Sequence, residues 1–265
     1  FIDTKFEDFI IAATVSQPYF LRGIYRGIRL AKGKTLVNTV GDLIKGIVSD
    51  SISVSGGGNT CLGTALLLTP ISLSLGYLYS SHGHVNITDI TLIATKLLER
   101  FSTTSDAIDF YRAVRSANAG DVKQNTDLSY IPSKYRINVW DLKYRKKLRE
   151  RGITLWEVLY YSAIKDEDAD EVIKGYPRTL NLINFLSDRL RKHGDWNRAV
   201  VESFLFQLSR EKDTFIVKTH NESVAEEVSS RAEELLQYCL ENNWSNCLTK
   251  LIEFDNELYK RKINP

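Results

Sequence analysis

The longest uncharged stretch of the chain lies between Asp50 and Asp89, where no Asp, Glu, Lys or Arg occurs. Its apolar residues from Leu62 to Tyr79 occupy every side of a helical wheel, and such a helix is buried or lies in a membrane. The run is just long enough to span a bilayer. However, it is interrupted by Pro70 and has no flanking Lys or Arg cluster. We therefore predict a buried central helix rather than a membrane span.

Apolar residues recur every three or four positions along most of the remaining chain, which predicts helices. The predicted helical ranges are 3–30 with a break at Pro18, 35–52, 88–101, one beginning after 102–106, 154–164, 179–192, 196–209, 224–238 and 248–262. No alternating pattern of useful length predicts a strand. The expected fold is all-α, with residues 1–265 forming a single multi-helix domain around the buried central helix.

A glycine-rich stretch precedes the central helix. We call it the glycine segment, and it consists of Ser55, Gly56, Gly57, Gly58, Asn59 and Thr60. Glycines let the backbone approach a ligand closely and adopt positive φ. Asn and Thr are good N-cap residues, and the free N–H groups of the next helix suit a phosphate. The spacing matches neither a Walker loop nor a dinucleotide fingerprint. Two interpretations stay open: a phosphate cradle, or a turn that joins two helices.

Composition narrows the class of protein. The 35 Lys and Arg nearly balance the 33 Asp and Glu, which argues against a general nucleic-acid binder. The three cysteines, Cys61, Cys239 and Cys247, are odd in number and lack metal-site spacing. We expect reduced thiols and a cytoplasmic protein without a membrane role. The sequence leaves monomer and homo-oligomer open.

Charged residues supply candidates for chemistry. Glu7 and Asp8 lie in the first turn of a predicted helix, where acids also stabilise the helix dipole. Arg112 and Arg115 are three residues apart and can meet one polyphosphate. Asp109 lies within one turn of Arg112, so an internal ion pair is the equal alternative.

Four further features have weaker interpretations. His82 and His84 on a Gly/Ser loop are poor evidence for a metal site. The acidic residues 166–171 lack EF-hand spacing and fit a solvated helix start. The basic run 143–151 fits a solvated helix face, with a lesser role in docking phosphates. The loop 117–131, which contains Asp121, is a candidate lid.

Five stretches together resemble one known family. Residues 55–63 read Ser-Gly-Gly-Gly-Asn-Thr-Cys-Leu-Gly, similar to the Gly-Gly-x-Asn-Thr-x-x-Gly signature of the triphosphoribosyl-dephospho-CoA synthases. Four other stretches resemble this family in the right order: 3–9, 106–115, 213–220 and 254–265. The resemblance covers essentially the whole chain. It is specific because the glycine signature and the Asp213-Thr…Lys218-Thr-His220 stretch occur in register.

The resemblance implies a transferase that joins the ribosyl triphosphate of ATP to 3′-dephospho-CoA and releases adenine. The glycine segment would then bind phosphate, helped by Arg112, Arg115 and Lys218. Glu7 and Asp8 would hold Mg²⁺ or face the ribose. Catalytic roles would fall to Asp213, His220 and Glu7, as carboxylates and a proton donor or acceptor.

Departures from the family pattern keep other functions open. Cys61 stands where many members have His or Asn, and Asn221 stands where Gly commonly follows the His. Family segments that carry functional residues also precede Phe1 and follow Pro265 in relatives, so we expect the site within this sequence to be incomplete. The alternatives are the same nucleotide chemistry on a different acceptor, or a helical ATP-binding module without catalysis.

Overall fold

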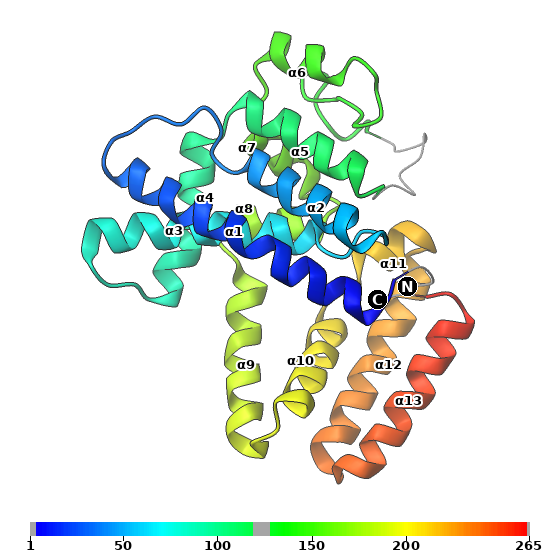
Figure 1. The fold of residues 1–265 in the computed structure, drawn as a ribbon. Coiled ribbons are helices and arrows are strands. Elements are labelled where there is room, and N and C mark those ends of the chain that lie inside the picture. Colours follow the sequence, from blue (N-terminus) through cyan, green and yellow to red (C-terminus); the bar gives the residue numbers. More distant parts are fainter. Residues whose placement is uncertain (1–3, 119–127, 264–265) are drawn as a thin grey trace. The chain divides into compact units, whose positions relative to one another are not determined.

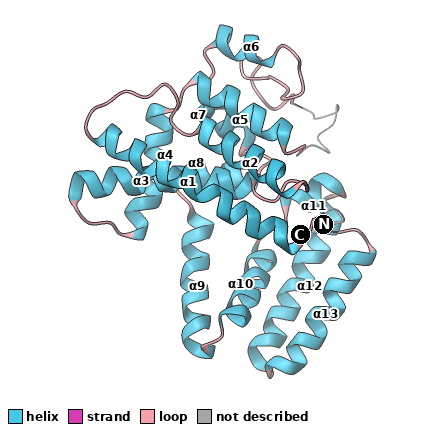
Figure 2. Cartoon of the chain, viewed as in Figure 1, coloured by secondary structure: helices cyan, strands magenta, loops and turns pink. Residues whose placement is uncertain are grey.

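The computed structural model describes residues 4–118 and 128–263, and this part of the chain contains thirteen α-helices and no strand (Figures 1 and 2). The all-α prediction is confirmed. The chain divides into two compact units, Phe1–Tyr176 and Pro177–Pro265. The prediction of a single domain stays a prediction. Each unit has its own hydrophobic core.

Unit 1 contains α1 (Phe6–Ala31), α2 (Gly41–Ser55), α3 (Leu62–His82), α4 (Ile87–Phe101), α5 (Thr104–Ser116), α6 (Tyr144–Arg151), α7 (Leu155–Ser162) and α8 (Glu167–Ile173). Unit 2 contains α9 (Pro177–His193), α10 (Trp196–Arg210), α11 (Thr214–Thr219), α12 (Glu222–Glu241) and α13 (Trp244–Lys260). The short helices α8 and α11 were not predicted as separate elements.

Helix α3 is the predicted buried central helix, and it packs against α1, α2, α4 and α8. Among the described helices it alone is long and apolar enough to cross a membrane by length and composition, and half of its most apolar window is buried. Its polar side chains are satisfied inside the fold: the Ser74 hydroxyl donates to the Ile90 carbonyl and the Thr69 hydroxyl to the Ala65 carbonyl. Packing within unit 1 therefore covers half of this apolar window.

Glycines set the distance between α1 and α3. A Cβ added at Gly76 would lie 1.9 Å from the Ile24 carbonyl oxygen, and one at Gly27 would lie 1.9 Å from the Leu73 carbonyl oxygen. The two backbones therefore touch directly. Pro18 lies inside α1, and the helix continues through it. The predicted break at Pro18 is therefore wrong. A proline inside a helix costs about 3 kcal/mol or more, so packing along α1 must outweigh that cost.

Because of this close contact, we expect a Gly→Ala substitution in α3 to lower the free energy of unfolding instead of raising it. Gly→Ala in a helix normally stabilises by up to about 1 kcal/mol. For Gly76→Ala we expect the opposite, a loss of about 3 kcal/mol in the free energy of unfolding, because backbone atoms cannot move aside. Denaturant unfolding measures this loss. Ser80→Ala, on the exposed face of the same helix, should change it by less than about 0.5 kcal/mol. A stabilised Gly76→Ala variant would contradict the contact.

A buried ion cluster joins α9 to α10 in unit 2. The fully buried Glu202 accepts hydrogen bonds from Arg189 at 2.5 Å and Arg198 at 2.8 Å, and His193 lies 3.2 Å away. Burial alone would raise the pKa of Glu202, but the two guanidinium groups outweigh it and lower the pKa. Burial lowers the pKa of His193 below its ordinary value of 6.5.

Both shifts predict that acid destabilises unit 2. The folded chain holds the His193 proton and the Glu202 proton less tightly than the unfolded chain does, so stability falls as pH decreases. The loss begins below the ordinary His pKa of 6.5 and grows below the ordinary Glu pKa of 4.5. We expect thermal unfolding between pH 7.5 and 5.5 to show the first step. His193→Gln should remove that step, whereas His82→Gln, at the exposed end of α3, should keep it. An unchanged slope in His193→Gln would refute this assignment.

The oxidation state of the cysteines differs in part from the prediction of three reduced thiols. Cys61 is a free, buried thiol, as predicted. Cys239 and Cys247 form a disulfide that joins α12 to α13, with the two Cα atoms 5.0 Å apart. The expectation of reduced thiols is therefore wrong for this pair. The turn between the two helices brings the cysteines together although eight positions separate them.

Candidate active site

The glycine segment connects α2 to α3 and has defined geometry. Gly56 ends α2 in the left-handed conformation with φ 68°, which favours glycine, and its N–H donates to the Ile52 carbonyl. The Gly57 N–H donates to the Ser55 hydroxyl at 3.1 Å. The segment is thus a helix-ending turn, one of the two interpretations of its sequence. Its role as a phosphate cradle stays a prediction.

Asn59 organises the start of α3. Its side-chain oxygen accepts from the Cys61 N–H at 3.2 Å and the Leu62 N–H at 3.0 Å. The helix begins at Leu62 with Cys61 as its N-cap residue, so Asn59 supplies the capping oxygen from two positions earlier. Thr60 is half-buried beside it. The following N–H groups of the first helical turn carry the positive end of the helix dipole, which favours an anion.

The structure brings Asp8 to the glycine segment. A Cβ added at Gly57 would lie 2.8 Å from Asp8 Oδ2, so any larger residue there would force this carboxylate to move. Asp8 is 7% exposed, and its Oδ2 accepts from the Lys5 N–H at 2.8 Å in the capping box of α1. Glu7, one position earlier, is exposed because neighbouring helical residues point about 100° apart. The two acids therefore differ in environment, and only Asp8 faces the glycines.

Sequence reasoning missed a second carboxylate beside the segment. A Cβ added at Gly63 would lie 2.5 Å from Oδ2 of Asp168 in α8. The expected solvated helix start at 166–171 is therefore wrong in part, because Asp170 and Glu171 are also buried. The spacing of the acidic run holds no signal for this contact, but the absence of a side chain at Gly63 allows it. Two carboxylates thus lie along the stretch from Gly57 to Gly63.

The candidate arginines have internal partners. Arg112 donates to Asp109 Oδ1 at 2.8 Å, so the ion pair considered as the alternative is present. Asp109 also lies 3.2 Å from the Lys45 ammonium group. Arg115 donates to the Val139 carbonyl at 3.0 Å, and its guanidinium stacks on two aromatic rings. The two arginines thus have different partners in this structure, and their binding of one polyphosphate stays a prediction.

Asp213, Lys218 and His220 lie together in unit 2, around α11. Asp213 is the N-cap of this helix, and its Oδ1 accepts from the N–H groups of Phe215 and Ile216. Lys218 lies in the last turn and His220 is the C-cap, and both are exposed. Lys218 is therefore helical, so the extended geometry that would place it on the same side as His220 is absent.

The remaining candidate residues are exposed on the surface or fall outside the described ranges. His82 and His84 are both exposed, but only His84 lies on the loop after α3. The predicted loop is wrong for His82, because α3 continues to this residue and ends at Gly83. Residues 143–151 form α6 with its N-cap, and their charged side chains are mostly exposed, as expected. Asp3, Asp121 and most of the proposed lid lie outside the described residues. Within the described ranges, no group of three or more His, Cys, Asp or Glu side chains gathers as a metal site.

Comparison with known proteins decides the family. The model of the ATP:dephospho-CoA triphosphoribosyl transferase family matches residues 1–265. The chain belongs to this family. Accordingly, it is a transferase, and the resemblance drawn from the glycine segment and the Asp213 stretch is confirmed.

A solved structure supports the fold of this triphosphoribosyl transferase. A provisionally assigned triphosphoribosyl-dephospho-CoA synthase from Archaeoglobus fulgidus superposes with a TM-score of 0.65. The two sequences are 20% identical, and the match covers 97% of this chain and 90% of the other. At this identity the likeness bears on the fold alone. A comparison with curated proteins found no match.

Proposed function

We propose that this protein transfers the 5-triphosphoribosyl group of ATP to 3′-dephospho-CoA. The bond between ribose C1′ and adenine N9 breaks, and a bond forms between C1′ and the acceptor's ribose 2′-oxygen. The 2′-hydroxyl proton passes to a base, and adenine leaves with the bonding electrons and takes up a proton. One observation carries the proposal: a chain of this family holds its signature glycines against the Asp8 carboxylate.

The chemistry requires negative charge near the ribose and positive charge near the triphosphate. Breaking a glycosidic bond produces an oxocarbenium-like transition state, which a carboxylate stabilises. Peptide N–H groups of the glycine segment and of the first turn of α3 would bind phosphate oxygens. The other roles rest on the family resemblance. Asp213 would be the second carboxylate, His220 would carry a proton, and Glu7 would face the ribose. Lys218, Arg112 and Arg115 would bind phosphate.

The donor set beside the glycine segment fits Mg²⁺. Asp8 contacts Gly57 and Asp168 contacts Gly63, so a bound triphosphate would meet two carboxylates. Phosphate and carboxylate charges brought close together repel each other unless a cation lies between them. Mg²⁺ is commonly bound through one or two carboxylates together with substrate phosphates. We therefore propose that Asp8 holds the ion, which would neutralise triphosphate charge when bound. A ligand role for Glu7 rests on the family resemblance alone, because its side chain is exposed and does not face the glycines. A cytoplasmic location, where ATP is available, is part of the same proposal.

Adenine release tests the proposal. The protein is incubated with ATP, Mg²⁺ and 3′-dephospho-CoA, free adenine is followed by chromatography, and the acceptor is weighed by mass spectrometry. We expect equal amounts of adenine and a triphosphoribosyl adduct. The analogue lacking the 2′-hydroxyl should give no adduct. Adenine without an adduct would point to a different acceptor or to water. Tight ATP binding without adenine would favour the non-catalytic module and refute the proposal.

A further inference from the structure

A cavity of about 390 Å³ lies in unit 1, away from the glycine segment. It is lined by Leu30 at the end of α1, the turn 33–36, Tyr77 of α3, and Arg100 and Phe101 at the end of α4. From Leu62, where α3 begins, to Tyr77 the helix rises by about 22 Å. This distance separates the cavity from any triphosphate bound at the glycine segment.

The charged residues that line the cavity are all positive. Lys34 and Arg100 are its charged side chains, and no carboxylate lines the cavity. Neither cation has a carboxylate partner within the described part of the chain. The carbonyl ends of α1 and α4 lie nearby, but each carries only about half a negative charge. Both side chains are exposed at the rim of the cavity, so water solvates their charges and an anion can reach them.

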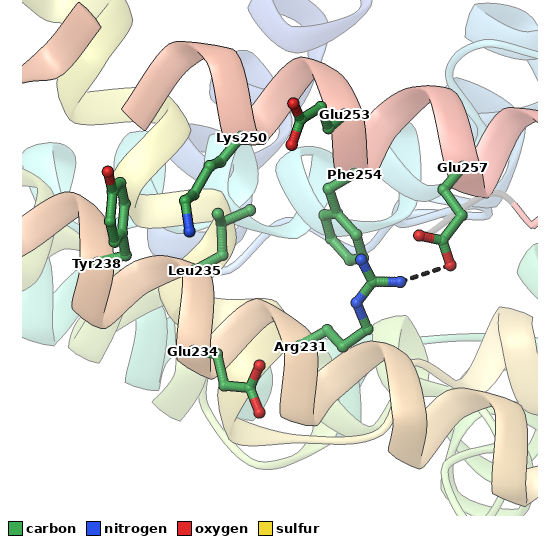
Figure 3. Close-up of a pocket in the computed structure, with 8 residues that line it drawn as sticks. All are labelled: Arg231, Glu234, Leu235, Tyr238, Lys250, Glu253, Phe254 and Glu257. Atoms are coloured by element: carbon green, nitrogen blue, oxygen red, sulfur yellow. Dashed lines mark hydrogen bonds and ion pairs between the residues drawn. The ribbon is translucent and has the colours of Figure 1, made fainter. Parts of the chain in front are cut away.

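A second cavity, in unit 2, shows what an internally balanced pocket looks like (Figure 3). Its volume is about 310 Å³ and it lies between α12 and α13. Arg231 pairs with Glu257 at 2.5 Å and stacks on Phe254, and Lys250 lies over the Tyr238 ring. Two more carboxylates, Glu234 and Glu253, line it. Its lining holds three carboxylates against two cations, so the unit 2 pocket calls for no anion.

The unit 1 cavity also offers aromatic surface. Tyr77 and Phe101 line it, and the Arg100 guanidinium lies 5.1 Å from the centre of the Phe101 ring. Aromatic side chains and a stacked guanidinium bind flat heterocycles, and Arg and Lys bind phosphate. The volume falls within the range of small-molecule sites.

We propose that the unit 1 cavity is a second binding site, for a nucleoside monophosphate or a closely similar phosphorylated ring compound. Lys34 and Arg100 bind the phosphate, and Tyr77 and Phe101 contact the ring. This inference goes beyond the proposed transfer reaction and does not rest on it.

AMP is the probe, and hydrogen exchange locates its binding. We expect AMP to protect the amides of 33–36 and 97–101 in the full chain. The double variant Lys34→Gln/Arg100→Gln should lose this protection and bind AMP at least about tenfold more weakly at that site, because two charge-assisted contacts are removed. Lys96→Gln is the matched control: it removes an exposed charge one turn earlier on α4, outside the lining, and should bind AMP as the parent protein does.

The ring is tested separately. Ribose 5-phosphate, which lacks the base, should bind about tenfold more weakly than AMP, and Tyr77→Leu should abolish most of that difference. The proposal is overturned if AMP protects only the glycine segment, if the double variant keeps the protection at 33–36, or if both probes bind equally. Adenine release is not part of this readout, so a failure of the transferase proposal would leave the result interpretable.

Discussion

Asp8→Asn is expected to lower the rate of adenine release at least about a hundredfold while leaving the fold intact. The Asp8 carboxylate lies against Gly57. The substitution removes its negative charge. An Asn side chain has the same shape, and its carbonyl oxygen can still accept from the Lys5 N–H. Steady-state rates with saturating ATP and Mg²⁺, together with circular dichroism, separate chemistry from folding.

Glu7→Gln provides the comparison on the same helix turn. Glu7 is exposed and points away from the glycines, so we expect its substitution to cost about tenfold less than that of Asp8. If Asp8 holds Mg²⁺, Asp8→Asn should also need a higher Mg²⁺ concentration for half-maximal rate. A near-normal rate for Asp8→Asn, or a larger loss for Glu7→Gln, would remove Asp8 from the active site.

Asp106→Asn should lower the free energy of unfolding by about 4 kcal/mol. Asp106 is fully buried, and its Oδ1 accepts from the N–H groups of Thr39, Val40 and Gly41 at 2.7 to 2.9 Å. Its Oδ2 accepts from the N–H and the hydroxyl of Thr103. One carboxylate thus holds the start of α2 and the start of α5 together. An amide has only one acceptor oxygen, so its NH₂ group would face the Thr103 donors.

An exposed acid in an equivalent helix position is the control. Asp89 lies in the first turn of α4, where Asn86 caps the helix. Asp89→Asn should change the free energy of unfolding by less than about 1 kcal/mol. Denaturant titration of both variants gives the comparison. A loss below about 1 kcal/mol for Asp106→Asn would show that the junction of α2 and α5 does not depend on this carboxylate.

Hydrophobic periodicity was enough to predict the helical fold, but it did not show that helices continue through their prolines. Pro18 and Pro70 lie inside α1 and α3, and both helices continue through them. Local chemistry favours a break at each proline. The direct backbone contact of α1 with α3, made possible by Gly27 and Gly76, is a tertiary interaction that periodicity does not report.

The candidate site was predictable only in part for the same reason. The ion pair of Arg112 with Asp109 follows from helix spacing. The contact of Asp8 with Gly57 joins residues 49 positions apart, and only the family resemblance suggested a common role. The contact of Asp168 with Gly63 had no sequence signal at all, since the acidic run resembles a solvated helix start. The disulfide of Cys239 with Cys247 depends on the turn between α12 and α13.

An isotopic label in the ribose of ATP shows directly which bond the protein breaks. ATP that carries ¹³C in its ribose is incubated with the protein, Mg²⁺ and 3′-dephospho-CoA, and the acceptor and the free base are both analysed by mass spectrometry. We expect the labelled ribose and all three phosphates to move together to the acceptor, with one unlabelled adenine released for each adduct. Labelled ADP or AMP with an unmodified or merely phosphorylated acceptor would contradict it, because the bond broken would then be a phosphate bond and not the glycosidic bond.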